Sequence, residues 1–130
     1  MNFNETMVLG RLTREPMTKE INGSKVAFFT VASNRSVAKK DGSRTEKTLF
    51  LDCELWGEAS SIVADRATKG TTIFVRGPLE QDTYEDKEGV KRTKFRLRVE
   101  FFQLGDAPRP RNGDEAPSRA RSNEEEELPF

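Results

Sequence analysis

Aromatic and acidic side chains alternate with apolar ones along residues 48–56, and this alternation could support binding chemistry. In an extended strand, successive side chains point to opposite faces. One face would hold Leu49, Leu51, Cys53 and Leu55, and the other would hold Phe50, Asp52, Glu54 and Trp56. The first set has the composition of a core. Because an aromatic ring on an open sheet can stack on a nucleic-acid base, Phe50 and Trp56 are candidate stacking residues. The alternative to stacking is that Phe50 and Trp56 are buried in a subunit interface or under a helix.

Basic side chains alternate with apolar ones in the same way along residues 92–104. One face would hold Phe95, Leu97, Val99 and Phe101, and the other would hold Lys94, Arg96, Arg98 and Glu100. Three cations at two-residue spacing form a row about 13 Å long in a strand. Phosphates could follow this row, and a solvated sheet face explains it equally well.

Further aromatic and basic residues lie near the predicted loops. Tyr84 precedes a hairpin turn at residues 86–89, which is surrounded by Lys87, Lys91 and Arg92. The polar segment 36–45 and its flank carry Arg35, Lys39 and Lys40. Aromatic faces for bases and cations for phosphates together indicate binding of single-stranded nucleic acid without sequence preference. A protein that reads duplexes would more often present a recognition helix.

The composition argues against an enzyme and against a bound metal or cofactor. The chain has no histidine, which removes the commonest general base and metal ligand. A single cysteine cannot build a zinc site, and no glycine-rich loop precedes a helix as a phosphate-binding loop would. We therefore expect no catalytic residue, no metal and no cofactor.

The length of 130 residues is that of one domain plus a tail. There is no run of 18 apolar residues and no secretory signal pattern at the start, so we expect no membrane span and no export. The single cysteine permits no internal disulfide, which fits a reducing cytoplasm. We expect a cytoplasmic protein associated with the nucleoid.

Charge is distributed unevenly along the chain. Residues 1–105 hold 18 Lys and Arg against 15 Asp and Glu, whereas residues 106–130 hold 4 against 7. The last seven residues are Glu124, Glu125, Glu126, Glu127, Leu128, Pro129 and Phe130. Burying one Phe side chain gains roughly 1.5–3 kcal/mol, so an apolar end on an acidic stretch could dock in a partner's pocket. A solvated terminus explains the composition equally well.

The residue pattern predicts an all-β domain with one helix. The predicted strands are residues 7–12, 25–35, 48–56, 71–77 with a continuation at 80–84, and 92–104. A helical period over residues 58–68 separates the third strand from the fourth. This order predicts a five-stranded Greek-key barrel with one helix between strands three and four. We expect a domain over 1–105, a disordered linker over 106–123 and a docking tip over 124–130.

The chain resembles the bacterial single-stranded DNA-binding proteins of the SSB type over residues 3–105 and 124–130. The resemblance lies in several short stretches, in their order along the chain and in the spacing between them. The matching stretches are residues 8–12 (VLGRL) with Glu15-Pro16, residues 26–33 (VAFFTVAS), residues 50–57 (FLDCELWG), Lys69-Gly70, residues 75–79 (VRGPL) and the acidic end in Pro-Phe.

The resemblance implies an OB-fold, usually a homotetramer, that wraps single-stranded DNA and recruits replication, recombination and repair proteins through its acidic tip. Its stacking positions fall on Phe50, Trp56 and Tyr84, and Lys69 falls on a basic position of the binding face. With the basic residues found above, the DNA-binding candidates are Arg11, Arg35, Lys39, Lys40, Lys69, Lys94, Arg96, Arg98 and the three aromatics.

This sequence departs from the family at several positions. Val37 stands where an aromatic is common, Glu58, Glu80 and Asp82 stand where Lys or Arg is common, and Asp52 lies on the presumed DNA face. Such acids would repel phosphates and weaken binding, which indicates a divergent member, either from a phage or a second copy beside a housekeeping protein. An interaction module that has largely lost DNA binding is the competing hypothesis.

Overall fold

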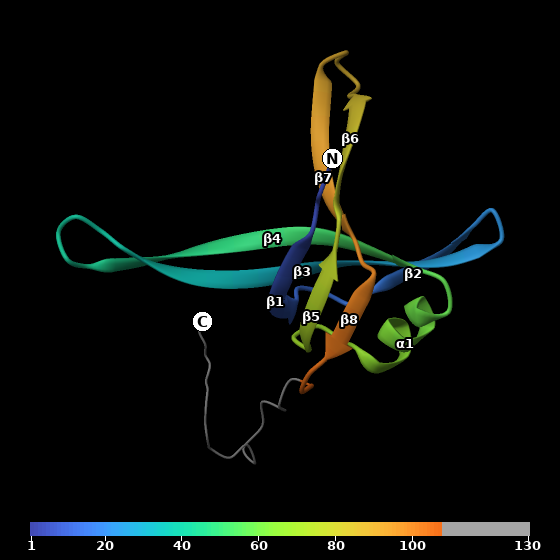
Figure 1. Cartoon of the computed structure of the whole chain (residues 1–130), viewed down its shortest axis with the longest axis horizontal. Coiled ribbons are helices and arrows are strands. Elements are labelled where there is room, and N and C mark those ends of the chain that lie inside the picture. The colour runs from blue at the N-terminus through green and yellow to red at the C-terminus, as the bar shows by residue number, and fades with distance from the viewer. Residues whose placement is uncertain (108–130) are drawn as a thin grey trace.

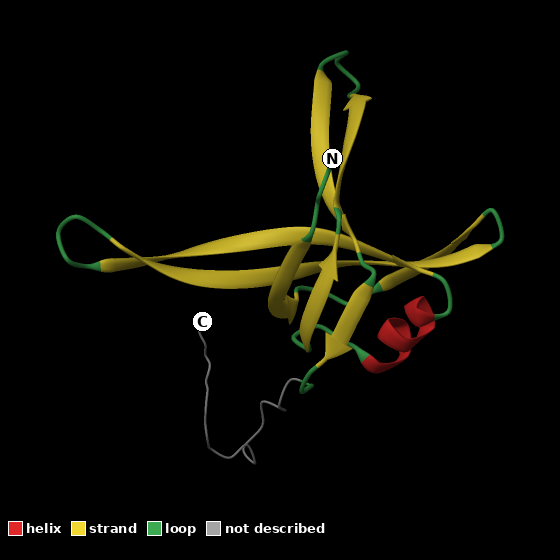
Figure 2. Cartoon of the chain, in the orientation of Figure 1, coloured by secondary structure: helices red, strands yellow, loops and turns green. Residues whose placement is uncertain are grey.

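The computed structural model describes residues 1–107, which form eight strands and one short helix (Figures 1 and 2). The elements are β1 (Thr6–Leu12), β2 (Met17–Ile21), β3 (Ser24–Ala38), β4 (Arg44–Trp56), α1 (Ala59–Arg66), β5 (Thr72–Gly77), β6 (Leu79–Glu85), β7 (Lys91–Arg98) and β8 (Phe101–Leu104). In this part of the chain, no helix is both long and apolar enough to span a bilayer. The predicted all-β class with one helix between the third and fourth predicted strands is confirmed.

The strands pair in the order β6-β7-β4-β3-β1-β5-β8, and β2 pairs with β3 beside this path. All pairs are antiparallel except β4 and β7, which run parallel. Only Val99 and Glu100 separate β7 from β8. The Val99 N–H donates to the Glu54 carbonyl of β4 at 2.9 Å, and the Glu100 N–H donates to the Arg76 carbonyl of β5 at 2.9 Å. The continuous segment from β7 to β8 therefore bonds to β4 through β7 and to β5 through β8.

The predicted count of five strands was wrong, because exposed strands lack the apolar alternation that marks a buried face. Every residue of β2 is exposed, and a tight turn at Asn22 and Gly23 pairs it with β3. The segment 36–45, predicted as a loop, mostly continues the β3–β4 hairpin and leaves only residues 39–43 as the connection. Pro78 separates β5 from β6, and the predicted fifth strand is divided into β7 and β8. Figure 1 shows the β2–β3, β3–β4 and β6–β7 hairpins projecting from the body.

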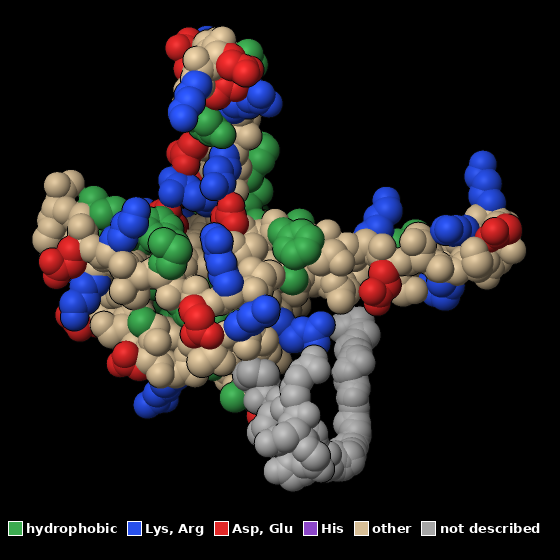
Figure 3. All heavy atoms as spheres, turned by 180° about the vertical axis from the view of Figure 1, so that it is seen from behind, with side chains coloured by type: hydrophobic (Ala, Val, Ile, Leu, Met, Phe, Trp, Pro, Cys, Tyr) green, Lys and Arg blue, Asp and Glu red, His purple; other side chains and the backbone are tan. Residues whose placement is uncertain are grey.

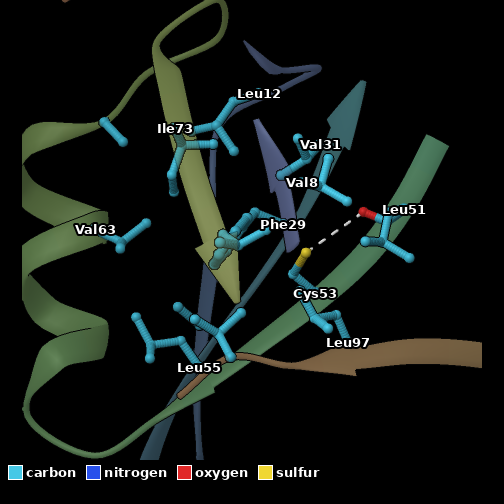
Figure 4. Close-up of a cluster of buried hydrophobic side chains, with 14 residues drawn as sticks. Val8, Leu12, Phe29, Val31, Leu51, Cys53, Leu55, Val63, Ile73 and Leu97 are labelled. Carbon is cyan, nitrogen blue, oxygen red and sulfur yellow. Dashed lines mark hydrogen bonds between the residues drawn. The ribbon is translucent and has the colours of Figure 1, made fainter. Parts of the chain in front are cut away.

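The core lies between the strands of the body and α1 (Figure 4). Its buried side chains come from β1, β3, β4, α1, β5 and the end of β7, and include Val8, Phe29, Val31, Leu51, Leu55, Val63, Ile73 and Leu97. The predicted core positions Leu51, Cys53 and Leu55 are confirmed. Leu49, Phe95 and Phe101 are exposed, because the first two lie on projecting hairpins and the third points outward from β8.

Cys53 lies within this core, where burial and the nearby Asp52 charge raise the pKa of its thiol to about 12. We predict that a thiol reagent does not label the native protein at pH 8 but labels it fully in denaturant. Because the unfolded thiol ionises near pH 9, the free energy of unfolding should fall as the pH rises from about 9 towards 12. Labelling kinetics and urea melts at pH 8 and pH 10 check both expectations, and rapid native labelling would contradict them.

Candidate nucleic-acid interface

The predicted aromatic and basic residues of β4, β6 and β7 lie on one outward face of the sheet. Cross-strand partners project from the same face, so the pairs Glu54 with Arg98, Asp82 with Lys94 and Tyr84 with Arg92 fix the arrangement. We call this surface the aromatic face. Its members are Phe50, Asp52, Glu54 and Trp56 of β4, Glu80, Asp82 and Tyr84 of β6, and Lys94, Arg96 and Arg98 of β7.

Phe50 is the most open of the three aromatic residues, with 65% of its surface exposed. Its neighbour across the β3–β4 pair is Ala32, whose small side chain leaves the ring uncovered on that side. Ala32 also pairs with Arg11 of β1. Phe50 and Arg11 therefore stand two strands apart, about 10 Å at the usual strand spacing. A base stacked on Phe50 would have the Arg11 guanidinium within reach of its phosphate.

Trp56 ends β4 and is held by two neighbours. Its Nε1–H donates to Oε1 of Glu54 at 3.0 Å, and the Arg98 guanidinium lies over the indole at 5.3 Å from the ring centroid. A hollow of about 480 Å³ adjoins the ring and is lined by Glu20, Gly23, Ser24, Lys25, Trp56, Gly57, Glu58 and Arg98. The indole thus has one face covered by a cation, and a base that stacks there must use the other face or replace Arg98.

Tyr84 lies near the end of the β6–β7 hairpin and is 50% exposed. The turn beyond it is organised by Asp86, which accepts from the backbone N–H groups of Glu88 and Val90 and from Nε of Arg92 at 2.8 Å. The Arg92 hydrogen bond and these N–H groups lower the pKa of the Asp86 carboxyl. Because Arg92 also pairs with Tyr84 across the hairpin, the ordered turn fixes the strand that carries the phenol.

The row of Lys94, Arg96 and Arg98 exists as predicted, but each cation faces a carboxylate. The ion pairs are Lys94 with Asp52 at 3.2 Å, Arg96 with Glu54 at 2.6 Å and with Asp82, and Arg98 with Glu80 at 4.0 Å. Four carboxylates thus surround three cations, so these seven side chains together carry no net positive charge. The sequence could not show this pairing, because the acids lie on β4 and β6 and meet β7 only through the sheet register.

The basic residues of the β3–β4 hairpin are differently placed. Arg35, Lys39 and Lys40 are exposed on the projecting arm, and no ion pair involves them within residues 1–107. Figure 3 shows Lys and Arg side chains along this arm. Val37 lies on the same arm and is partly buried. The arm is therefore a more available contact for phosphates than the row on β7.

Lys69 lies in the connection between α1 and β5, apart from the aromatic face. Its backbone N–H donates to Oε2 of Glu15 at 3.1 Å, and its side chain is exposed. The next residue, Gly70, donates its N–H to the carbonyl of Leu12 at the end of β1. The structure thus places Lys69 beside the end of β1, in a connection that contributes none of the residues of the aromatic face. The predicted tip 124–130 and most of the predicted linker 106–123 lie outside the described residues.

A curved β-sheet around one core, with one helix and an outward face of aromatic and charged side chains, defines an OB-fold protein. The profile of the Single-strand binding protein family matches residues 3–105, and the chain belongs to this family. The Single-stranded DNA-binding protein of Helicobacter hepaticus is 33% identical over 116 residues, which are 88% of this chain and 67% of that protein. The protein of the same name from Aquifex aeolicus is 32% identical over 98% of this chain and 82% of its own length.

Two solved structures share the fold. The Plasmodium falciparum SSB complex with ssDNA superimposes with a TM-score of 0.75 at 20% identity, over 82% of this chain and 97% of that one. A deletion mutant of the single-stranded DNA binding protein from Thermus aquaticus gives 0.71 at 25% identity, over 80% of this chain and 51% of that one. The chain spans 65% of the Wolinella succinogenes relative and 56% of the one from Paenarthrobacter aurescens.

Proposed function

We propose that this chain binds single-stranded DNA without marked sequence preference, by stacking bases on Phe50, Trp56 and Tyr84. The observation that carries this proposal is the placement of all three aromatic side chains on one outward face. Stacking tolerates any base, because every base has an aromatic face. The names of the relatives from Helicobacter hepaticus and Aquifex aeolicus support the same ligand.

Phosphate contacts, in this proposal, come mainly from cations that form no ion pair within residues 1–107. Arg11 next to Phe50 and the arm residues Arg35, Lys39 and Lys40 are exposed, whereas Lys94, Arg96 and Arg98 are already matched by carboxylates. DNA would follow the outer surface of the sheet from the β6–β7 hairpin across β4 to the β3–β4 arm. Lys69 would contact only a longer strand that continues past the end of β1.

The test uses Trp56, which is the single tryptophan of the chain. Oligo-dT should quench its fluorescence at low salt, because a base stacked on the indole or displacing Arg98 changes the ring's surroundings. The affinity should fall with salt by about 0.7 log units per log unit of salt for each phosphate neutralised. Absence of both quenching and a mobility shift at low salt would refute the proposal.

We further propose that the protein protects single-stranded DNA during replication, recombination and repair, and that residues 124–130 recruit proteins of these processes. The support is the sequence of the tip, in which four acids precede Leu128, Pro129 and Phe130. The acids would steer the tip towards a basic surface, and the Phe ring would fill an apolar pocket. We also propose that it works in the cytoplasm, at the nucleoid.

Removal of Leu128, Pro129 and Phe130 is predicted to abolish the retention of partner proteins from a bacterial extract. The lost ring alone accounts for roughly 1.5–3 kcal/mol of binding, about 10- to 150-fold in affinity. DNA binding should stay unchanged or become slightly tighter, because the aromatic face is intact. Affinity capture with the full chain and the truncated chain, followed by mass spectrometry, compares the two. The same partners retained by the truncated chain would contradict the assignment of the tip.

We propose that the chain assembles with itself, as a homotetramer, through the outer surface of β1, β5 and β8. The register brings Met7 and Leu9 of β1 together with Phe74 of β5 and Phe101 of β8 on that surface. The Phe74 and Phe101 rings meet edge to face at 6.1 Å, and Met7 and Leu9 are exposed. An apolar patch of this kind typically marks a protein contact. Light scattering with and without oligo-dT measures the number of subunits.

A second function, an oligomeric scaffold that mainly displays tips, is favoured by the carboxylates of the aromatic face. The four acids paired with Lys94, Arg96 and Arg98 oppose phosphate binding there. A comparison of two affinities distinguishes DNA binding from the scaffold: that of the protein for oligo-dT and that of the tip peptide for its partners. If oligo-dT binds more weakly than the tip peptide binds its partners, the scaffold describes the protein better.

A further inference from the structure

Glu54 is a buried carboxylate at the centre of the aromatic face. Only 3% of its surface is exposed, although its neighbours Asp52 and Trp56 on the same face of β4 are half-buried. A buried charge is costly unless it is paired and hydrogen-bonded. Glu54 meets this requirement with both of its oxygens. One partner is Trp56, which the proposed function uses for stacking, and the other is Arg96 of the cation row on β7.

The first oxygen of Glu54 fixes the tryptophan. Oε1 accepts the Nε1–H of Trp56 at 3.0 Å, and this is the only polar group of the indole. The Arg98 guanidinium lies over the ring of the same Trp56 at 5.3 Å. The indole is thus held at its polar edge by Glu54 and on one face by Arg98, which sets the direction of its remaining face.

The second oxygen of Glu54 fixes an arginine. Oε2 lies 2.6 Å from Nη1 of Arg96, while Nη2 of Arg96 faces Asp82. The Nε of Arg96 is buried and has no hydrogen-bond partner within residues 1–107, so the polar contacts of the guanidinium in this part of the chain are those with Glu54 and Asp82. An arginine whose two terminal nitrogens are both held by carboxylates is not free to follow a phosphate.

We propose that Glu54 is a positioning residue of the DNA-binding surface, which orients Trp56 for stacking through one oxygen and withholds Arg96 from phosphates through the other. The effect of Glu54 on DNA binding rests on the proposed function. The positioning of Trp56 is a property of the free protein. Trp56 would then act through stacking, and Arg96 would contribute to the fold of the face and not to phosphate contact.

The first experiment measures the free protein. In Glu54→Gln the amide oxygen can still accept from the indole, so emission, anisotropy and acrylamide quenching of Trp56 should stay as in the parent. Glu54→Val removes the acceptor, so the anisotropy should fall and acrylamide quenching should rise. Asp52→Asn is the matched control, because it removes a carboxylate of the same face that pairs with Lys94 and Thr30. Parent-like fluorescence in a folded Glu54→Val protein would overturn the positioning of Trp56.

The second experiment measures the salt dependence of oligo-dT binding. Asp82→Asn alone should leave the slope unchanged, because Glu54 still holds Arg96. The double variant Glu54→Gln with Asp82→Asn releases Arg96, and the slope should steepen by about 0.7, the value for one added phosphate contact. A steeper slope in Asp82→Asn alone, or an unchanged slope in the double variant, would overturn the retention of Arg96 by Glu54.

The two experiments separate the two proposals. Should the parent protein fail to bind oligo-dT, the proposed function fails, while the fluorescence of the free variants still decides whether Glu54 positions Trp56. Should Glu54→Val not fold, Glu54→Leu, which also lacks the acceptor, replaces it in the fluorescence experiment, and the salt slope of Glu54→Gln with Asp82→Asn still decides whether Glu54 withholds Arg96. Circular dichroism of each variant establishes that it is folded before either measurement.

Discussion

Replacing Phe50 with alanine is expected to weaken oligo-dT binding by about 5- to 150-fold, because loss of one base–aromatic stack costs about 1–3 kcal/mol. Phe50 is the stacking candidate with the largest open surface, and Ala32 across the strand pair leaves its ring uncovered. The effect should be larger than that of removing any one cation of the β7 row, since those cations already face carboxylates. Titration of Trp56 fluorescence with oligo-dT measures the loss.

Phe95→Ala is the matched control for this prediction. Phe95 is an exposed aromatic like Phe50, but it pairs with Gln81 and projects from the opposite side of the β6–β7 hairpin. Its removal should leave oligo-dT affinity within experimental error of the parent. Equal losses in the two variants would show that a general change of the protein, and not stacking on Phe50, weakens binding. Because Phe50 is largely solvated, thermal stability should change little in Phe50→Ala.

Gly77→Ala is expected to destabilise the fold strongly, by about 3 kcal/mol, since a tightly packed site has no room for an added methyl group. A Cβ atom at Gly77 would stand 2.0 Å from the carbonyl oxygen of Arg98 and 3.1 Å from the backbone nitrogen of Glu100. Both are backbone atoms at the passage from β7 to β8, so relief requires the strands to separate. A loss of this size lowers the Tm of a domain of about 100 residues by roughly 10–20 °C.

Gly105→Ala serves as the comparison for this substitution. A Cβ atom at Gly105 would meet Cβ and Cγ2 of Thr72 at 3.1 and 3.2 Å, a crowding that a shift of a few tenths of an ångström relieves. Thermal melts of the two variants should therefore differ, with a small shift for Gly105→Ala and a large one for Gly77→Ala. Similar melting temperatures for Gly77→Ala and the parent would show that the β7–β8 passage is more pliable than its close contacts indicate.

The parts of the fold that could be predicted from the sequence are those with one buried face. The alternation of Leu51, Cys53 and Leu55 with Asp52 and Glu54 correctly predicted residues 48–56 of β4, because apolar side chains at every second position need a core. The exposed strand β2 and the distal β3–β4 hairpin lack such a face and so lack the signal. Backbone hydrogen bonds across short turns stabilise β2 and the distal β3–β4 hairpin, and amino-acid composition does not predict such pairing.

The candidate site also has a part that could be predicted from the sequence and a part that could not. Period-two alternation placed Phe50 and Trp56 on one strand face, and the register of β6 with β7 adds Tyr84 to it. The acids Asp52, Glu80 and Asp82 were expected to oppose phosphates, but their ion pairs could not be predicted, because they lie on other strands than Lys94, Arg96 and Arg98. Glu54 was assigned no role from the sequence. Its function depends on the contacts with Trp56 and Arg96, which only the folded sheet brings together.

Only Val99 and Glu100 separate β7 from β8. This short segment connects the aromatic face to the apolar outer surface of β8, and it has no extra residue that could absorb a shift. Arg98 belongs to the aromatic face, Val99 to the core, and Phe101 to the apolar surface of β8. Insertion or deletion of one residue would reverse the side-chain alternation for one of these surfaces. A substitution at the exposed Glu100 should therefore be tolerated more readily than a change in the segment's length, which would reverse the facing of one whole surface relative to the other.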